Sequence, residues 1–127
     1  MAQKTFQAIG DGETPKGEVL QVARLAGIQA GKKTGELIPL CHLLPGTSLA
    51  VEVELDPDLP GVRVRTTATI AGQTGVEMEA LTASAVALLT VYDMAKAIDR
   101  GMVIEGIRLL SKEGGRSGSW SRTEEEG

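Results

Sequence analysis

The sequence contains very few aromatic side chains, with one Phe, one Tyr and one Trp among 127 residues. Its hydrophobic fraction of 42% must therefore fill a core mainly with small aliphatic side chains, which allow helices to approach sheets and other subunits closely. The length favours one domain, which we place at residues 1–120. We predict that residues 121–127 form a disordered acidic tail.

Cysteine and histidine are equally scarce, since Cys41 and His42 are the sole examples of each. One cysteine excludes a disulfide within the chain and any zinc or iron–sulfur site built from several cysteines of one chain. We therefore predict no protein-bound metal.

The sequence also lacks an excess of basic residues, because it contains 13 Lys and Arg and 17 Asp and Glu, for a net charge of −4. This balance argues against nucleic-acid binding, although a local group of lysines can still hold a small anion. No apolar run approaches the roughly 18 residues of a membrane span, and the N-terminus lacks a signal-peptide core. We predict a cytoplasmic protein without a membrane partner.

What is present is a pattern of helical and alternating apolar spacings that indicates an α+β fold. The expected elements are a helix at 19–30 stopped by Gly31, strands at 49–55 and 62–70, a helix at 76–98 and a last strand at 101–112. Residues 1–14 show no clear element. Helix, hairpin, helix and strand in this order predict an antiparallel sheet with helices packed on one face.

The Cys41–His42 dipeptide lies in an apolar loop between Pro39 and Pro45, where backbone amides are free to meet a ligand. The alternative is a loop that caps the core, with the imidazole hydrogen-bonded to a carbonyl. A nucleophilic Cys–His pair is not expected, because such pairs usually come from distant segments.

Glu77 and Glu79 flank Met78 at the start of the long helix, where acidic residues also occur simply because they favour the helix dipole. The functional alternative is that a carboxylate accepts hydrogen bonds from a guanine-like edge. Gly72 and Gly75 just before would let that ligand approach the backbone.

Asp93 and Lys96 share a face of the same helix, being three residues apart. They could be a plain surface ion pair. The apolar surroundings instead favour a partly buried pair that supplies an acid and a base.

Other cations could form an anion site or could simply be solvated. They are Lys16, Lys32, Lys33, Lys112 and Arg116. Lys16 lies on what we expect to be a mobile lead-in between Pro15 and Gly17, and Lys112 and Arg116 bracket two glycines whose backbone amides could wrap an anion.

Six segments occur together and in order: KGEVL from Lys16, ARLAGI from Ala23, LIPLCH from Leu37, TGVEMEALTA from Thr74, YDMAKA from Tyr92 and RLLSKEGGRSG from Arg108. Together they closely resemble the cyclic pyranopterin monophosphate synthase family, over about Pro15 to Trp120. The family's N-terminal segment, with a DVS-like start and an arginine, finds no match in residues 1–14.

This resemblance implies a ferredoxin-like subunit in a homohexamer, a trimer of dimers with active sites at subunit interfaces. It implies a substrate, a 3′,8-cyclised dihydro-GTP supplied by a radical GTP cyclase, that becomes cyclic pyranopterin monophosphate and diphosphate. No cofactor is implied, and whether Mg²⁺ accompanies the triphosphate stays open.

The resemblance also assigns roles to residues. The catalytic set is Asp93, Lys96 and Lys16. The substrate-binding set is Leu40, Cys41, His42, Met78, Glu79 and Lys112, to which the hypothesis of a guanine-like edge adds Glu77. Two rival functions remain: a nucleotide-binding module without catalysis, and a purely structural oligomer.

Overall fold

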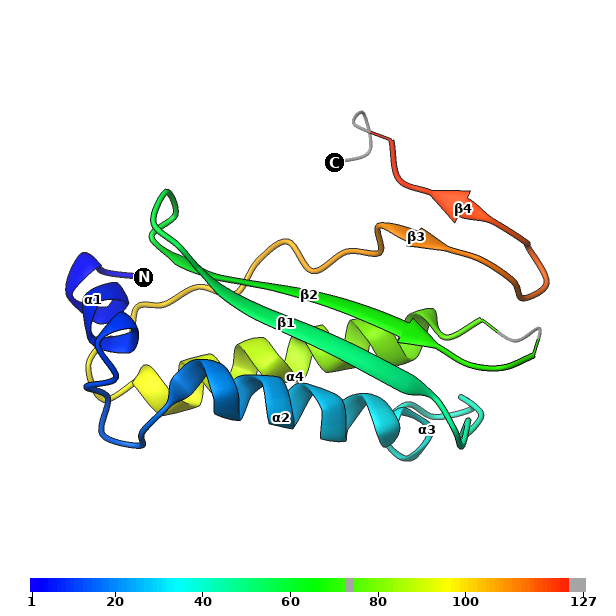
Figure 1. Ribbon diagram of the computed structural model, residues 1–127, viewed down its shortest axis with the longest axis horizontal. Helices are drawn as coiled ribbons and strands as arrows, with labels where there is room; N and C mark the ends of the chain where they lie inside the picture. The colour runs from blue at the N-terminus through cyan, green and yellow to red at the C-terminus, as the bar shows by residue number, and fades with distance from the viewer. Residues whose placement is uncertain (73–74, 124–127) are drawn as a thin grey trace.

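The computed structural model describes residues 1–72 and 75–123 and shows two long helices side by side against one face of a two-stranded antiparallel sheet (Figure 1). The elements are α1 (Gln3–Gly10), α2 (Val19–Lys32), α3 (Thr34–Leu37), β1 (Ser48–Asp56), β2 (Gly61–Thr69), α4 (Glu77–Ala95), β3 (Ser111–Lys112) and β4 (Trp120–Ser121). The predicted α+β class is confirmed. The order α2–β1–β2–α4 is the central helix–hairpin–helix of a ferredoxin-like arrangement.

The predicted hairpin is confirmed in position and in register. β1 and β2 pair so that Glu52 lies opposite Arg65 and Glu54 lies opposite Arg63 on the exposed face. The intervening residues turn toward the helices, and Val51 is buried among them. The period-2 pattern therefore gave the correct faces, because a half-buried strand alternates between core and solvent.

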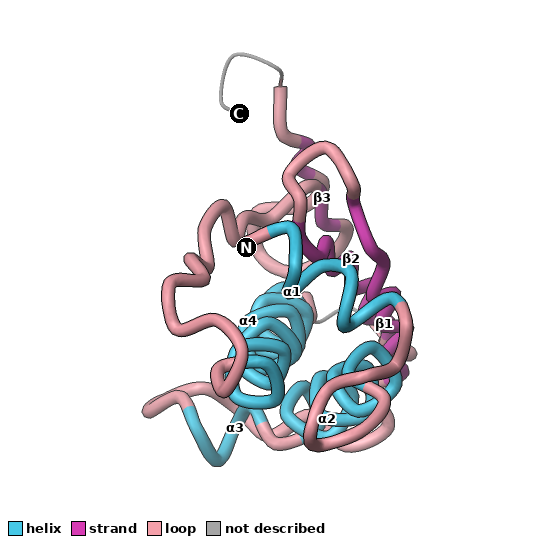
Figure 2. The backbone as a smooth tube through the Cα atoms, turned by 90° about the vertical axis from the view of Figure 1, so that its left-hand side faces the viewer, coloured by secondary structure: helices cyan, strands magenta, loops and turns pink. Residues whose placement is uncertain are grey.

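Small residues bring α2 and α4 into close contact, as the tube view along the helices shows (Figure 2). A Cβ atom on Gly27 would lie 3.0 Å from the carbonyl oxygen of Ala83, and one on Gly31 would collide with the side chain of Leu49. Gly31 is thus a packing residue inside α2, which continues to Lys32. The prediction that Gly31 stops the helix is wrong, because tertiary packing outweighs its low helix propensity.

The N-terminal helix α1 had no predicted counterpart. Its Thr5 and Ile9, one helical turn apart, are buried, while most of its other residues are partly or fully exposed. Two buried positions in eight residues give too short a pattern to identify a helix from periodicity.

The predicted last strand at 101–112 is wrong over residues 101–110. This segment runs back along the molecule from the end of α4 without strand pairing, and only Ser111–Lys112 forms β3, paired with Trp120–Ser121 (Figure 1). Gly106 has a φ of 67°, in the left-handed region, which interrupts the extended backbone that a strand at 101–112 requires.

The ordered chain also extends beyond residue 120. Ser121 belongs to β4, and the backbone N–H of Arg122 donates to the carbonyl of Leu110 at 2.8 Å. The predicted start of a disordered tail at Ser121 is therefore wrong, and residues 124–127 lie outside the described part.

α4 is 19 residues long with a mean hydropathy of 1.2, so by length and composition it could cross a membrane, contrary to the expectation for this chain. One such helix is weak evidence for a membrane segment, since the core helix of a globular protein meets the same criterion. Here α4 packs against α2 and β2 and begins with two glutamates.

Candidate active site

Two groups of candidate residues lie at opposite ends of α4. In Figure 1 its C-terminal end adjoins the α1–α2 connection at the left, and its N-terminal end lies near α3 and the loop after it at the right. Glu79 and Asp93 are fourteen residues apart on this helix, or about 21 Å at the usual rise.

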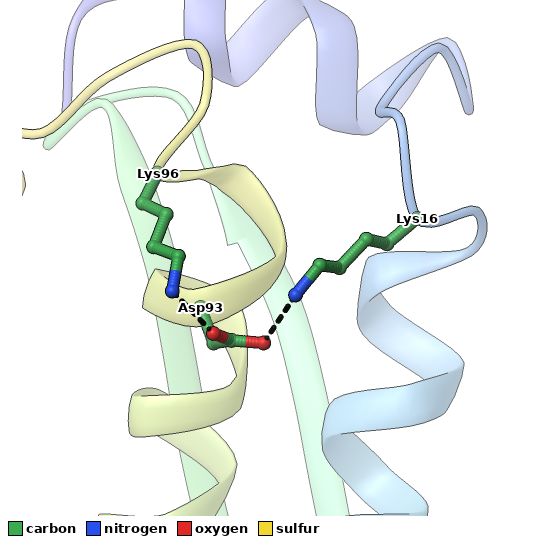
Figure 3. A network of polar contacts seen from close by, with 3 residues as sticks. All are labelled: Lys16, Asp93 and Lys96. Carbon is green, nitrogen blue, oxygen red and sulfur yellow. Dashed lines mark hydrogen bonds and ion pairs between the residues drawn. The ribbon is translucent and has the colours of Figure 1, made fainter.

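The C-terminal group brings together all three residues predicted to be catalytic (Figure 3). Lys96 Nζ donates to Asp93 Oδ1 at 2.8 Å, and Lys16 Nζ donates to Asp93 Oδ2 at 2.8 Å. Helical spacing explains the first contact, because residues three apart share a face. The second joins positions 77 residues apart, which only the packing of α2 against α4 makes neighbours.

Electrostatics in this group favour an ionised carboxylate. The hydrogen bonds from Lys16 and Lys96, with the attraction of their charges, lower the pKa of Asp93 from 3.8 to about 2. The group thus carries two positive charges and one negative charge at neutral pH and presents a net positive surface to an anion.

The burial expected for this group is not found. The side chains of Lys16, Asp93 and Lys96 are 55%, 52% and 47% exposed. Asp93 and Lys96 follow apolar residues, yet they lie on the outward side of α4, where Leu89 is exposed as well. The prediction of a partly buried pair is wrong, because apolar neighbours in sequence point to other faces of a helix.

Lys16 is carried by a hydrogen-bonded turn rather than by the mobile lead-in that was expected. Thr14 is buried, its hydroxyl donates to the carbonyl of Gly17 at 2.5 Å, and the N–H of Gly17 donates back to Thr14 at 3.1 Å. Gly17 has a φ of 97°, a conformation that glycine adopts without strain.

The N-terminal group surrounds a cavity of about 220 Å³. It brings two predicted segments together, since the lining residues are Leu40, Cys41, His42, Leu44, Gly75, Glu77, Met78 and Glu79. The sequence did not single out Leu44, although it belongs to the same apolar loop. Adjacent to this cavity, and sharing Leu44 with it, is a second one of about 210 Å³ that Lys32 lines.

The carboxylates of this cavity differ from Asp93 in their surroundings. Glu79 is only 3% exposed, and Oε2 of Glu77 is buried without a hydrogen-bond partner among the described residues. A buried carboxylate oxygen without a donor is costly, so these side chains are suited to accept N–H groups from a ligand.

The loop that faces the carboxylates is held in an unusual conformation. Leu40 has a φ of 62°, the one non-glycine residue in the left-handed region within the described ranges. The thiol of Cys41 is directed to the carbonyl oxygen of His42, at 3.9 Å, and His42 is exposed. The partner of the thiol is thus a backbone carbonyl. Backbone strain of this kind is common where a loop contacts a ligand.

Lys112 lies at the same end of the molecule. Its Nζ donates to the carbonyl of Gly114 at 3.1 Å, and a Cβ atom on Gly115 would lie 3.5 Å from both Lys112 Nζ and the backbone N of Gly75. The glycine-rich turn thus brings this lysine close to a lining residue of the cavity. Lys33 and Arg116 are exposed and belong to neither group.

No cluster of three or more His, Cys, Asp or Glu side chains that could hold a metal ion occurs within residues 1–72 and 75–123. The ionisable side chains of the two groups are lysines, carboxylates, one thiol and one imidazole. Such a set can bind an anion, accept hydrogen bonds from a heterocycle and transfer protons.

Comparison with known proteins places this arrangement in a family. The MoaC family profile matches residues 1–115, and the chain belongs to the MoaC family. The match begins at residue 1, so the prediction that resemblance starts only at about Pro15 is wrong.

Named relatives agree with this family. The cyclic pyranopterin monophosphate synthase of Cereibacter sphaeroides is 59% identical over 118 residues, which are 93% of this chain and 74% of the relative. The protein of the same name from Brucella ovis is 56% identical over 121 residues, which are 95% of this chain and 73% of the relative.

Proposed function

We propose that the protein is a cyclic pyranopterin monophosphate synthase of molybdenum cofactor biosynthesis, in reaction class a phosphorus–oxygen lyase. It converts (8S)-3′,8-cyclo-7,8-dihydroguanosine 5′-triphosphate to cyclic pyranopterin monophosphate and diphosphate. The observation that carries the proposal is the contact of Asp93 with both Lys16 and Lys96, in a chain whose relatives bear that enzyme's name.

The reaction needs several proton transfers without net oxidation or reduction. The imidazole-derived ring of the substrate opens, and a pyrazine ring is built in its place. In this proposal the carboxylate of Asp93 acts as the base, and the ammonium of Lys96, hydrogen-bonded to it at 2.8 Å, acts as the acid. Because the two side chains are hydrogen-bonded to each other, Asp93 can accept a proton from the substrate while Lys96 donates one to it.

Formation of the cyclic phosphate is a displacement at phosphorus. A ribose hydroxyl oxygen bonds to the α-phosphorus, and the bond from that phosphorus to the bridging oxygen breaks, so that diphosphate leaves. Lys16 and Lys112 hold the phosphates in this proposal and offset the charge that develops on the leaving group. No organic cofactor takes part, and any magnesium arrives on the triphosphate as part of the substrate.

The cavity at the other end of α4 binds the guanine-derived ring. Glu77 and Glu79 accept its N–H groups, while Leu40, Cys41, His42 and Met78 enclose it. A buried Glu79 and a buried oxygen of Glu77 that lacks a hydrogen-bond donor among the described residues favour a ligand edge that is rich in donors.

The separation of the two groups supports an oligomer. The ring that reacts and the guanine-like edge belong to one fused ring system. Two groups about 21 Å apart on α4 of a single chain cannot both contact a ring system of that size. We propose a cytoplasmic homohexamer, a trimer of dimers, in which the cavity of one copy meets the Asp93 group of another. A radical GTP cyclase supplies the substrate.

Turnover of the cyclised substrate by the purified protein tests the proposal. The expected result is one diphosphate per cyclic pyranopterin monophosphate, and sedimentation should show a hexamer at micromolar concentration. Binding without turnover would instead indicate a nucleotide-binding module, absence of binding a structural oligomer, and a stable monomer would contradict the interfacial site.

A further inference from the structure

A carboxylate outside both groups links the two segments that carry the catalytic side chains. Asp99 lies four residues beyond the end of α4, where its own N–H and that of Ile98 donate to the carbonyl of Ala95, at 3.1 and 2.9 Å. It therefore belongs to a turn that is bonded to the last residue of α4, next to Lys96.

The carboxylate of Asp99 reaches across to the start of α1. Its Oδ2 accepts the backbone N–H of Ala2 at 2.8 Å and the hydroxyl of Thr5 at 3.1 Å, and its Oδ1 accepts the N–H of Gly101 at 3.0 Å. Thr5 is completely buried. Ala2 is the N-cap residue of α1, and no side chain of the helix makes a capping hydrogen bond there. The carboxylate of Asp99 therefore acts as the acceptor at this helix end.

From α1 the backbone leads to Lys16 through two consecutive hydrogen-bonded turns. After the helix ends, the N–H of Glu13 donates to the carbonyl of Ala8 at 2.9 Å, which folds the chain back onto α1. Thr14 is buried directly afterwards and closes the turn that carries Lys16. The position of this lysine therefore depends on the position of α1.

We infer that Asp99 is a positioning residue for the proposed reaction, which holds α1, and through it the turn of Lys16, in register with Asp93. The inference rests on the proposed function for its kinetic consequence, while the link itself is a matter of structure. Asp99 contacts neither Asp93 nor Lys16, so it acts through α1 and takes no part in proton transfer.

Ionisation of Asp99 fits this role. The hydrogen bonds from Ala2, Thr5 and Gly101 lower its pKa, so that the carboxylate stays charged at neutral pH and can accept from several donors at once. An amide at this position would replace one acceptor by a donor facing N–H groups.

The first part of the test does not need turnover. Amide hydrogen exchange in residues 3–17 should be faster in Asp99→Ala than in the wild type, while exchange in α2 and α4 stays unchanged. Asp56→Ala is the matched control, because Asp56 also accepts a backbone N–H, that of Asp58, and the Nε–H of Arg63, but at the β1–β2 turn. Unchanged exchange in residues 3–17 would overturn the inference, whether or not the wild type is active.

The second part measures kinetics in two backgrounds. A displacement of about 1 Å in an active site can lower the rate by up to about 100-fold, so we expect Asp99→Ala to lower kcat/KM about 10- to 100-fold, mainly through KM. In a Lys16→Ala background the same change should cost less than about twofold, since the residue through which it acts is gone. An equal loss in both backgrounds would show a general structural role and overturn the inference.

Thr5 supplies a second variant in case Asp99→Ala does not fold. Thr5→Val keeps the shape of the side chain and removes the donor to Asp99, and Thr5→Ser keeps the donor. Faster exchange in residues 3–17 and a raised KM for Thr5→Val, both restored in Thr5→Ser, support the inference. Identical behaviour of the two variants contradicts it.

Discussion

The two ends of α4 use carboxylates in opposite ways. At the C-terminal end Asp93 is half exposed and contacts two lysines, whereas at the N-terminal end Glu79 is buried and Glu77 has a buried oxygen without a described donor. The comparison teaches that charge pairing keeps one carboxylate ionised and accessible for proton transfer. Burial keeps the others fixed and available for the hydrogen bonds of a ligand.

The largest expected effect comes from removing the charge at the exposed end. Asp93→Asn should lower kcat by about 10²- to 10⁴-fold, the usual contribution of a general base, with substrate binding largely retained. Single-turnover kinetics and equilibrium binding separate the two quantities. Asp56→Asn, which removes a carboxylate bonded to Arg63, is the control and should keep its turnover.

If Asp93→Asn retained near-normal turnover, the proposed division between a catalytic end and a binding end would be lost.

Arginine substitutions distinguish the two lysines of the exposed end. Arginine keeps the positive charge but does not release a proton at working pH. Lys96→Arg should be almost inactive at every pH, whereas Lys16→Arg should keep part of its turnover with a higher KM. Rate measurements over a range of pH test this difference.

Equal losses in the two arginine variants would contradict separate roles for the lysines. An inactive Lys16→Arg variant together with an active Lys96→Arg variant would instead assign proton transfer to Lys16 and phosphate binding to Lys96.

At the buried end, removal of the imidazole should affect binding more than chemistry. His42 lines the cavity proposed to bind the guanine-derived ring and is not one of the proposed proton-transfer groups, so His42→Ala should raise KM about tenfold, the value of one hydrogen bond to a ligand, with kcat nearly unchanged. Steady-state kinetics provide the measurement. A fall in kcat with constant KM would place the imidazole in the chemical step.

The shape of that cavity depends on a glycine that does not line it. A Cβ atom on Gly35 in α3 would lie 2.7 Å from Cα of Leu43 and 3.1 Å from the carbonyl carbon of His42. Gly35→Ala should therefore displace the loop, raise KM several-fold and destabilise the fold by about 1–3 kcal/mol.

Gly10→Ala is the control for this substitution, because its Cβ would have an ordinary contact with Leu55 at 3.4 Å. Ligand binding and thermal unfolding of both variants test the prediction, and equal effects would contradict it.

The smallest effect concerns stability at low pH. Because the folded pKa of Asp93 is about 2 and its ordinary value is 3.8, the ionised group stabilises the fold above pH 3.8, and this contribution is lost as the pH falls through about 2. The wild type should thus be more stable than Asp93→Asn at neutral pH, with a difference that disappears in acid. The difference should be small, since all three side chains are about half exposed.

Urea unfolding of the two proteins across this pH range provides the measurement. A stability difference that stayed constant down to pH 2 would show that Asp93 does not titrate with this shift.

The sequence by itself determined the helix–hairpin–helix order, the faces of β1 and β2, and the pairing of Asp93 with Lys96. These follow from local periodicity and from spacing on one helix. Tertiary structure decided the rest: α2 continues past Gly31, Gly106 breaks the last strand, and the charged group is exposed. Packing between distant segments also placed Lys16 on Asp93 and brought His42 and Glu79 to one cavity. Contacts of this kind depend on how the helices and strands approach one another, which local periodicity does not specify.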